Sequence, residues 1–189
     1  MEACFKRFKD RAQNLLTTSE NVMYNGNMVS HEPYRTLVDA LLDHFGDRLQ
    51  AVVLFGSRSR DDARPESDHD IFVVIEGLPD NPLWRQREVR MALLDYLDEM
   101  PEGISILAKT PEEVDKDLTP LLVDVFMEGK PIWGESYFQE RHAKVARAVH
   151  EAGLVRRRIG GTWMWVFPSP RWHGWELTWE GYRELAKRS

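Results

Sequence analysis

The chain has 189 residues, of which 42% are hydrophobic and 30% are charged, and its formal net charge at pH 7 is −6. This composition is typical of a globular protein with one domain, or one domain and a small appendage, and no apolar run is long enough to span a membrane. The acidic balance argues against nonspecific coating of nucleic acid, although a local basic patch stays possible.

The N-terminal segment MEACFKRFKDRAQNLL predicts an amphipathic helix, because its apolar residues recur at helical spacing. It is interpreted as a packing helix or, alternatively, as a membrane-surface helix, and it lacks the apolar core of a secretory signal. Cys4 is the only cysteine in the sequence, which excludes an intrachain disulfide framework and favours a reducing, cytoplasmic setting. We assign residues 1–30 to this helix and a polar linker that turns at Asn25-Gly26.

Helices and strands alternate along the central part of the chain. The predicted helices cover about residues 31–45, 83–100, 118–127 and 135–152. A capping box at Thr110-Pro111-Glu112-Glu113 predicts the start of another helix. The predicted strands cover 49–56, 69–77 and 103–109, with a short edge strand in GKPIW. This alternation predicts an α+β (α/β-like) fold over residues 31–152, in which helices pack on a mixed β-sheet.

The C-terminal tail, residues 153–189, differs in composition. It contains most of the tryptophans: Trp163, Trp165, Trp172, Trp175 and Trp179. The segment GLVRRRIGGTWMWVF predicts a hairpin that turns at Gly160-Gly161, and WELTWEGYRELAKR predicts a short strand entering a helix. We interpret this Trp-rich tail as a winged-helix-like appendage. It is either a packing element or lid, or a surface that binds an acceptor, a protein or nucleic acid.

Alternation within the first tail hairpin separates its basic residues. Arg156 and Arg158 share one face of their strand, Arg157 lies on the other, and Trp163 and Trp165 share a face of the partner strand. Such a ribbon can bury its indoles on the main domain and offer arginines to an anionic acceptor. We expect removal of the tail to leave nucleotide binding largely intact.

Residues 54–75, LFGSRSRDDARPESDHDIFVVI, join two apolar strands by a charged linker. Asp68 and Asp70 stand two apart at the mouth of the second strand, so their side chains share one face and His69 lies on the other. Two adjacent carboxylates repel each other unless a cation joins them, and Mg²⁺ is often held by one or two carboxylates plus substrate phosphates. An isolated Asp-x-Asp is more often a solvated turn, so the metal hypothesis depends on the residues upstream.

Those upstream residues are suited to phosphate. Gly56 permits close approach of its backbone to a phosphate, and Ser57 adds a hydroxyl donor to the exposed backbone N–H groups. Arg58 and Arg60 bring positive charge to the place where triphosphate oxygens would lie. The order strand, Gly-Ser, arginines, Ser-Asp-x-Asp, strand therefore favours metal-assisted attack on a nucleotide phosphorus.

This combined motif resembles the DNA polymerase β-like nucleotidyltransferase superfamily, and its minimal nucleotidyltransferase branch in particular, over about residues 32–135. The resemblance implies transfer of a nucleoside monophosphate from a nucleoside triphosphate, with ATP the expected donor, to a hydroxyl acceptor, with release of pyrophosphate. The acceptor stays open between a small molecule, RNA and a protein. The implied residues are Asp68 and Asp70 for catalysis and Mg²⁺ binding, and Gly56, Ser57, Arg58 and Ser67 for nucleotide binding.

The sequence departs from the family pattern at one place. The family usually offers a third carboxylate from a later strand, and the corresponding strand here, ISILAK, carries Ser105 instead. Glu102 has the opposite parity, and Asp124 could take part only if its helix crossed the site. Two hypotheses follow: a Mg²⁺-dependent nucleotidyltransferase, or a catalytically weakened nucleotide-binding module with a regulatory or partner-binding role.

Overall fold

The computed structural model describes residues 23–24, 27–28, 32–60, 62–171 and 174–185. The predicted N-terminal helix and the turn at Asn25-Gly26 lie outside these residues. Two short strands, β1 (Met23–Tyr24) and β2 (Asn27–Met28), form an antiparallel ribbon ahead of the main domain.

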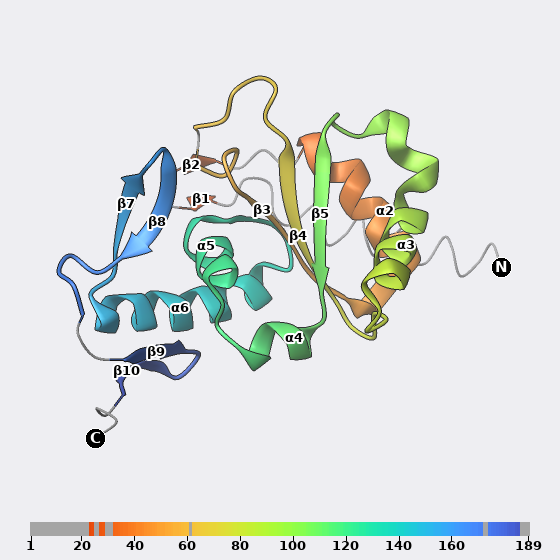
Figure 1. The fold of residues 1–189 in the computed structure, drawn as a ribbon. Coiled ribbons are helices and arrows are strands. Elements are labelled where there is room, and N and C mark those ends of the chain that lie inside the picture. Colours follow the sequence, from red (N-terminus) through yellow and green to blue (C-terminus); the bar gives the residue numbers. More distant parts are fainter. Residues whose placement is uncertain (1–22, 25–26, 29–31, 61, 172–173, 186–189) are drawn as a thin grey trace.

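A four-stranded mixed sheet with the strand order β5-β4-β3-β6 forms the centre of the fold (Figure 1). The strand β3 (Leu49–Phe55) pairs antiparallel with β4 (His69–Ile75) on one side and with β6 (Lys130–Trp133) on the other. The strand β5 (Ile104–Lys109) runs parallel to β4 and forms the second edge of the sheet. The predicted α+β fold with a mixed sheet is confirmed, and so is the edge position of GKPIW.

The predicted helices are present with shifted ends. They are α2 (Arg35–Phe45), α3 (Pro82–Leu93), α4 (Pro111–Lys116), α5 (Pro120–Glu128) and α6 (Glu135–Ala152), with 3-10 helices at Glu32–Tyr34, Gly46–Arg48 and Leu94–Glu99. The single helix predicted for residues 83–100 is wrong beyond Leu93. Because a 3-10 helix turns by more per residue than an α-helix, Leu97 is rotated out of the core and is 54% exposed. No helix among the described residues has the length and apolar character needed to span a bilayer.

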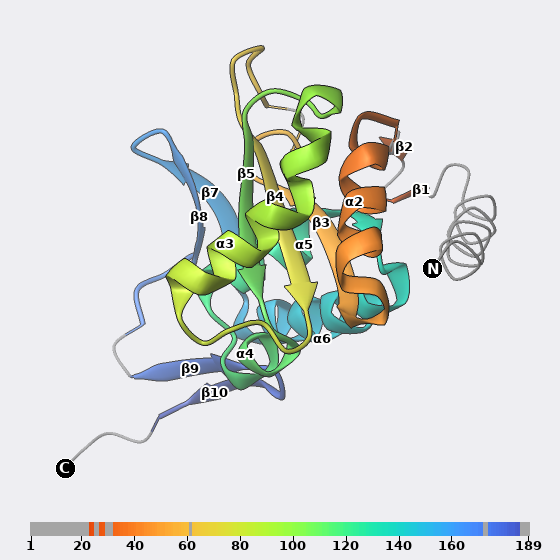
Figure 2. The same ribbon diagram turned by 90° about the vertical axis from the view of Figure 1, so that its right-hand side faces the viewer.

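Two helical layers cover the sheet, with α2 and α3 on one face and α5 and α6 on the other (Figures 1 and 2). Side chains of β4 alternate between these layers: Ile71 and Val73 join the core under α2 and α3, whereas Phe72 and Val74 join the core under α5. Extended to the start of the strand, this alternation places Asp70 on the α5 face.

The helix α4 begins at the predicted capping box. The hydroxyl of Thr110 accepts a hydrogen bond from the backbone N–H of Glu113, and the Glu113 carboxylate accepts one from the backbone N–H of Thr110. Arg85, on α3, donates to both carboxylate oxygens of Glu113 at 2.7 and 3.0 Å. The capping residue thus also ties α4 to α3 across the end of β5.

The tail consists of two antiparallel hairpins in its described residues, 153–171 and 174–185. The first, β7 (Val155–Ile159) and β8 (Thr162–Val166), turns at Gly160-Gly161 as predicted. The second, β9 (Trp175–Thr178) and β10 (Gly181–Glu184), replaces the predicted strand and helix, so the winged-helix comparison is wrong for this part.

The second hairpin owes its geometry to a glycine and an aromatic anchor. Gly181 has a φ of 137°, which a helix does not accommodate and which other residues rarely adopt. Trp179 packs edge-on against Phe126, with ring centroids 5.8 Å apart, and donates its indole N–H to the carbonyl of Val114. The tail therefore packs against the core under α5, as the packing-element interpretation expects.

Candidate functional site

The two aspartates of the Asp-x-Asp motif lie against glycine backbone at one end of the sheet. In the sheet register Asp70 lies between Phe55 of β3 and Ser105 of β5. A Cβ atom at Gly56 would overlap the Asp70 carboxylate, and one at Gly103 would lie 3.0 Å from Oδ1 of Asp68. Both glycines also have positive φ, 76° and 72°, so glycine suits each position on two grounds.

The carboxyl group of Asp70 has a pKa above its ordinary value. Burial raises the pKa of Asp70, and the neighbouring charge of Asp68 raises it further, while Arg60 opposes the shift. No cluster of three or more metal-ligating side chains occurs among the described residues. Two hard carboxylate oxygen donors fit the kind of Mg²⁺ site in which substrate phosphates and water supply the other ligands.

His69 lies behind the carboxylates, on the opposite face of β4. Its Nδ1 shares a 2.7 Å hydrogen bond with the hydroxyl of Tyr34, at the start of α2. Burial lowers the pKa of His69, and the positive charge of Arg58 lowers it further. This contact ties the start of β4 to the α2 layer, which fixes the strand on which Asp68 and Asp70 stand.

The loop between β3 and β4 is closed by its own side chains. Arg58 donates from Nε and Nη2 to the carbonyl oxygen of Ser67, at 2.9 and 2.6 Å, and also reaches the carbonyl of Pro65 at 3.2 Å. The hydroxyl of Ser67 accepts from the backbone N–H of Arg64 at 2.9 Å. The structure therefore places Arg58 and Ser67 in the internal bonding of the loop.

A second internal bond sets the start of the loop. Buried Ser59 donates its hydroxyl to the carbonyl of Gly56 at 3.0 Å, and the carbonyl of Ser57 accepts from the backbone N–H groups of Arg60 and Asp62. These bonds fold residues 56–60 into a tight turn directly after β3. The Gly56-Ser57 pair is thereby held beside Asp70.

Arg60 connects this loop to helix α5. Its Nη1 lies 3.4 Å from Oε2 of Glu128, its Nε lies 3.7 Å from Oδ1 of Asp62, and its charge acts on the Asp70 carboxyl. From the sequence, Arg60 is expected only to add positive charge near the phosphates. Its ion pairs depend on Glu128, which lies far along the chain and carries no motif of its own.

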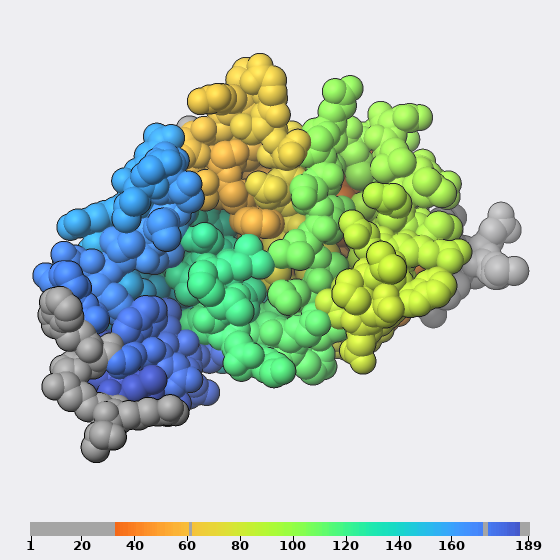
Figure 3. Space-filling model, in the orientation of Figure 1, coloured from red at the N-terminus to blue at the C-terminus, as the bar shows by residue number. Residues whose placement is uncertain are grey.

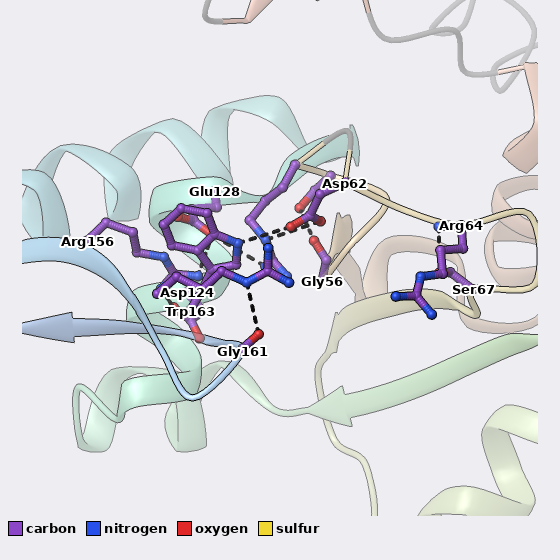
Figure 4. Close-up of polar contacts among 12 residues, drawn as sticks. Gly56, Asp62, Arg64, Ser67, Asp124, Glu128, Arg156, Gly161 and Trp163 are labelled. Carbon is purple, nitrogen blue, oxygen red and sulfur yellow. Dashed lines mark hydrogen bonds and ion pairs between the residues drawn. The ribbon is translucent and has the colours of Figure 1, made fainter.

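The first tail hairpin completes this network (Figure 4). Arg156 donates to Asp124 and also to Glu128, the latter at 2.6 Å, and the indole N–H of Trp165 donates to Asp124 at 3.0 Å. The indole N–H of Trp163 donates to Asp62 at 3.0 Å. The hairpin thus contacts both α5 and the loop that follows Gly56-Ser57.

These contacts correct the predicted orientation of the hairpin. In the register Arg156 lies opposite Trp165, so the arginine and the indole share one face, and that face is turned to the main domain. Arg156 is therefore paired with carboxylates of the chain itself. Asp124, considered as a third acid, is likewise engaged by Arg156 and Trp165.

Ser105 occupies the place expected from the sequence. It pairs in parallel register with Asp70, so the two side chains project from the same face of the sheet, and Ser105 is exposed.

Comparison with protein families decides the class. A family model described as "Nucleotidyltransferase domain" matches residues 34–146, more than half of the chain. The chain belongs to the nucleotidyltransferase family. The matched residues of this nucleotidyltransferase contain the whole central sheet, the loop after β3 and both aspartates, and the family makes the protein a transferase.

Relatives of this nucleotidyltransferase include a named protein and several solved structures. "Putative protein adenylyltransferase MJ1305" of Methanocaldococcus jannaschii is 28% identical over 99 residues, which cover 52% of this chain and 67% of the relative. A toxin-antitoxin structure with AMP-PNP is 22% identical over 62% of this chain and 85% of its own, with a TM-score of 0.43. A nucleotidyltransferase structure from Sulfolobus solfataricus is 20% identical over 54% of this chain and 80% of its own, with a TM-score of 0.38. At these TM-scores the structures add nothing to the assignment, which rests on the domain match.

Proposed function

We propose that this nucleotidyltransferase uses Mg²⁺ and ATP to attach AMP to a hydroxyl group of a protein, with release of pyrophosphate. The observation that carries the proposal is the pair Asp68 and Asp70 at the start of β4, where Asp70 lies against Gly56 and Asp68 lies against Gly103. The name of the M. jannaschii relative supports both AMP as the transferred group and a protein as the acceptor.

Asp68 and Asp70 would hold Mg²⁺, which, when bound, neutralises charge on the triphosphate and polarises the reacting phosphoryl group. Gly56 and Ser57 would receive phosphate oxygens, because the turn after β3 holds their backbone beside the Asp70 carboxylate. Arg60 would offset the charge that develops on pyrophosphate, because its positive charge already acts on the neighbouring Asp70 carboxyl.

The two sequence-assigned residues Arg58 and Ser67 have a further role in this proposal. Their hydrogen bonds hold the loop between β3 and β4, so they keep Ser57 and Arg60 in position whether or not they touch the nucleotide. Substituting Arg58 would therefore weaken nucleotide binding through the loop as well as through lost charge.

In the reaction the acceptor oxygen forms a bond to the α-phosphorus of ATP. The bond from that phosphorus to the oxygen bridging to the β-phosphorus breaks, and pyrophosphate leaves with the electron pair. The hydroxyl proton passes to solvent, because the strand beside Asp70 carries Ser105 where the family usually has a carboxylate. We expect turnover to be slow for this reason.

Labelled ATP tests the proposal. Label at the α-phosphate should enter a protease-sensitive, nuclease-resistant fraction of a cell extract, whereas label at the γ-phosphate should not. Asp68→Asn and Asp70→Asn should abolish Mg²⁺-dependent ATP binding and transfer, and both variants should stay folded because the repulsion between the carboxylates is relieved. Asp80→Asn, an exposed aspartate outside the site, is the matched control.

Three results would contradict the proposal in different ways. Label in RNA or in a small molecule would contradict the protein acceptor. Mg²⁺-dependent ATP binding without any transfer would favour the nucleotide-binding module. Unchanged Mg²⁺-dependent ATP affinity in Asp68→Asn would contradict the metal assignment itself.

A further inference from the structure

A groove of about 920 Å³ follows the edge strand β5 on the side away from β4. Helix α3 and the 3-10 helix after it form one wall, and β5 and α3 lie side by side on the face shown in Figure 3. The wall is apolar and accessible: Leu94 is 50% exposed and Leu97 is 54% exposed, and Leu107 of β5 is also exposed. This is more apolar surface in one place than exposed side chains scattered singly would give.

The backbone of β5 offers hydrogen bonds to this groove. In a parallel ladder the residues that face the neighbouring strand alternate, and the carbonyl of Gly103 accepts from the N–H of His69 in β4. Ile104, Ile106 and Ala108 therefore turn their backbone groups away from β4. Consistent with this, the carbonyl of Ala108 accepts from Arg85 at 3.4 Å.

The open part of this edge is its end nearest the catalytic site. Arg85 covers the edge at Ala108, whereas Ile104 and Ile106 precede that point. Gly103 and Ser105 line the groove and also touch the site, since Gly103 lies against Asp68 and Ser105 pairs with Asp70. The groove and the carboxylates are therefore continuous across one strand.

We propose that the acceptor polypeptide binds in extended conformation along β5, adding a strand to the sheet and presenting its hydroxyl side chain beside Ser105. This inference rests on the proposed function, because it places the acceptor of that reaction. Main-chain hydrogen bonds to Ile104 and Ile106 supply affinity, and the apolar wall receives alternate side chains of the added strand.

The charges of the groove specify the acceptor further. Glu102 lines the end next to the site, where Asp68 lies against Gly103, whereas Arg90 and Lys109 line the rest. Lys109 is four residues beyond Ser105, which corresponds to about 13 Å of strand. The acceptor segment should therefore carry apolar residues at alternate positions and an acidic residue about four positions from the hydroxyl.

A display library of ten-residue peptides with a central Ser, Thr or Tyr tests this binding mode without nucleotide. Enriched peptides should carry apolar residues at alternate positions and an acidic residue at the expected position. They should bind the Leu97→Asp protein about tenfold or more weakly than wild type. Met91→Asp is the matched control, because Met91 is also 54% exposed and does not line the groove; it should change affinity less than about twofold.

Hydrogen exchange and backbone methylation examine the strand pairing directly. A bound peptide should protect the amides of Ile104 and Ile106, whereas the amides of Ser105 and Leu107 already face β4. N-methylation of every second peptide amide should abolish binding in one register and spare it in the other. Ile106→Pro removes a backbone N–H that points away from β4 and should also abolish peptide binding. If this variant does not fold, peptide binding to Leu97→Asp tests the inference instead.

Each outcome counts for or against the inference. Failure to enrich any peptide, equal binding to Leu97→Asp and wild type, or equal effects of both methylation registers would overturn it. So would a dimer of the chain that Leu97→Asp dissociates, because a second copy would then occupy the groove. Peptide binding without AMP transfer would contradict only the proposed function, and transfer to protein that Leu97→Asp leaves unchanged would contradict only the docking site.

Discussion

Replacing Arg156 by Met should lower the free energy of unfolding by about 2–3 kcal/mol. The Arg156 side chain is 14% exposed and donates to Asp124 and Glu128, and its guanidinium lies 5.2 Å from the centre of the Trp165 ring. Removing one partner of a fully buried ion pair costs about 3–5 kcal/mol, because the other charge is left uncompensated. The value here is smaller, since Asp124 is 38% exposed and water screens it.

Glu128 bears most of this cost. Its side chain is 18% exposed, and burial raises its pKa while Arg156 and Arg60 oppose that shift. Without Arg156, the ion pair left to Glu128 among the described residues is the 3.4 Å contact with Arg60. Arg60 would then be the cation that compensates Glu128, so it would be drawn away from Asp70 and we also expect weaker ATP binding in this variant.

Guanidinium denaturation followed by tryptophan fluorescence measures the effect, since Trp163 and Trp165 lie in the same hairpin. Arg157→Met is the matched control: Arg157 is the next residue, faces the other side of β7 and is exposed, so its replacement should cost less than about 0.5 kcal/mol. Equal stability of the two variants would refute the reasoning. A double-mutant cycle with Glu128→Gln should show coupling between positions 128 and 156.

The pKa of Glu113 lies below its ordinary value: burial alone would raise it, but hydrogen bonds from Arg85 and from the Thr110 backbone outweigh that effect. The stabilisation from the Glu113 carboxylate is therefore present above its ordinary pKa and is lost as pH falls through the lowered one. Glu113→Gln should cost about 1 kcal/mol at neutral pH in thermal unfolding, and the cost should shrink as the pH is lowered into the acid range. Ser105→Asp should raise the transfer rate at least about tenfold while Ser105→Asn does not, and no gain in a folded, ATP-binding variant would mean that another group serves as base. Trp163→Phe removes the indole bond to Asp62 and should raise the KM for ATP a few-fold with little change in unfolding, as steady-state kinetics and denaturation together would show.

The sheet and the carboxylate pair could be predicted because they depend on local patterns. Period-2 alternation in DHDIFVVI predicts that Asp68 and Asp70 share one face, and the structure shows the alternation of this strand continuing through the two cores. The capping box at Thr110 was equally local. The position of Ser105 followed from placing its strand beside the Asp-x-Asp strand, and the register agrees.

The contacts of the tail could not be predicted in the same way. Alternation predicts which residues share a face of each strand. Which face packs on the main domain depends on the carboxylates of α5, and neither Glu128 nor Asp124 belongs to a recognisable sequence motif. The exposure of Leu97 depends on a change of helix type after Leu93 that the apolar spacing does not encode. Both errors concern tertiary packing and leave the local motifs as predicted.

The contacts of the first hairpin also link the tail to residues that lie beside the carboxylate pair. The first hairpin bonds Asp62 and Glu128, and these two carboxylates also hold Arg60 beside Asp70. The groove along β5 lies on the other side of the carboxylates. Substitutions in the hairpin should therefore weaken ATP binding, whereas substitutions in the groove should weaken binding of the acceptor. A variant such as Leu97→Asp that raised the KM for ATP and left the KM for the acceptor unchanged would be incompatible with this division of the site.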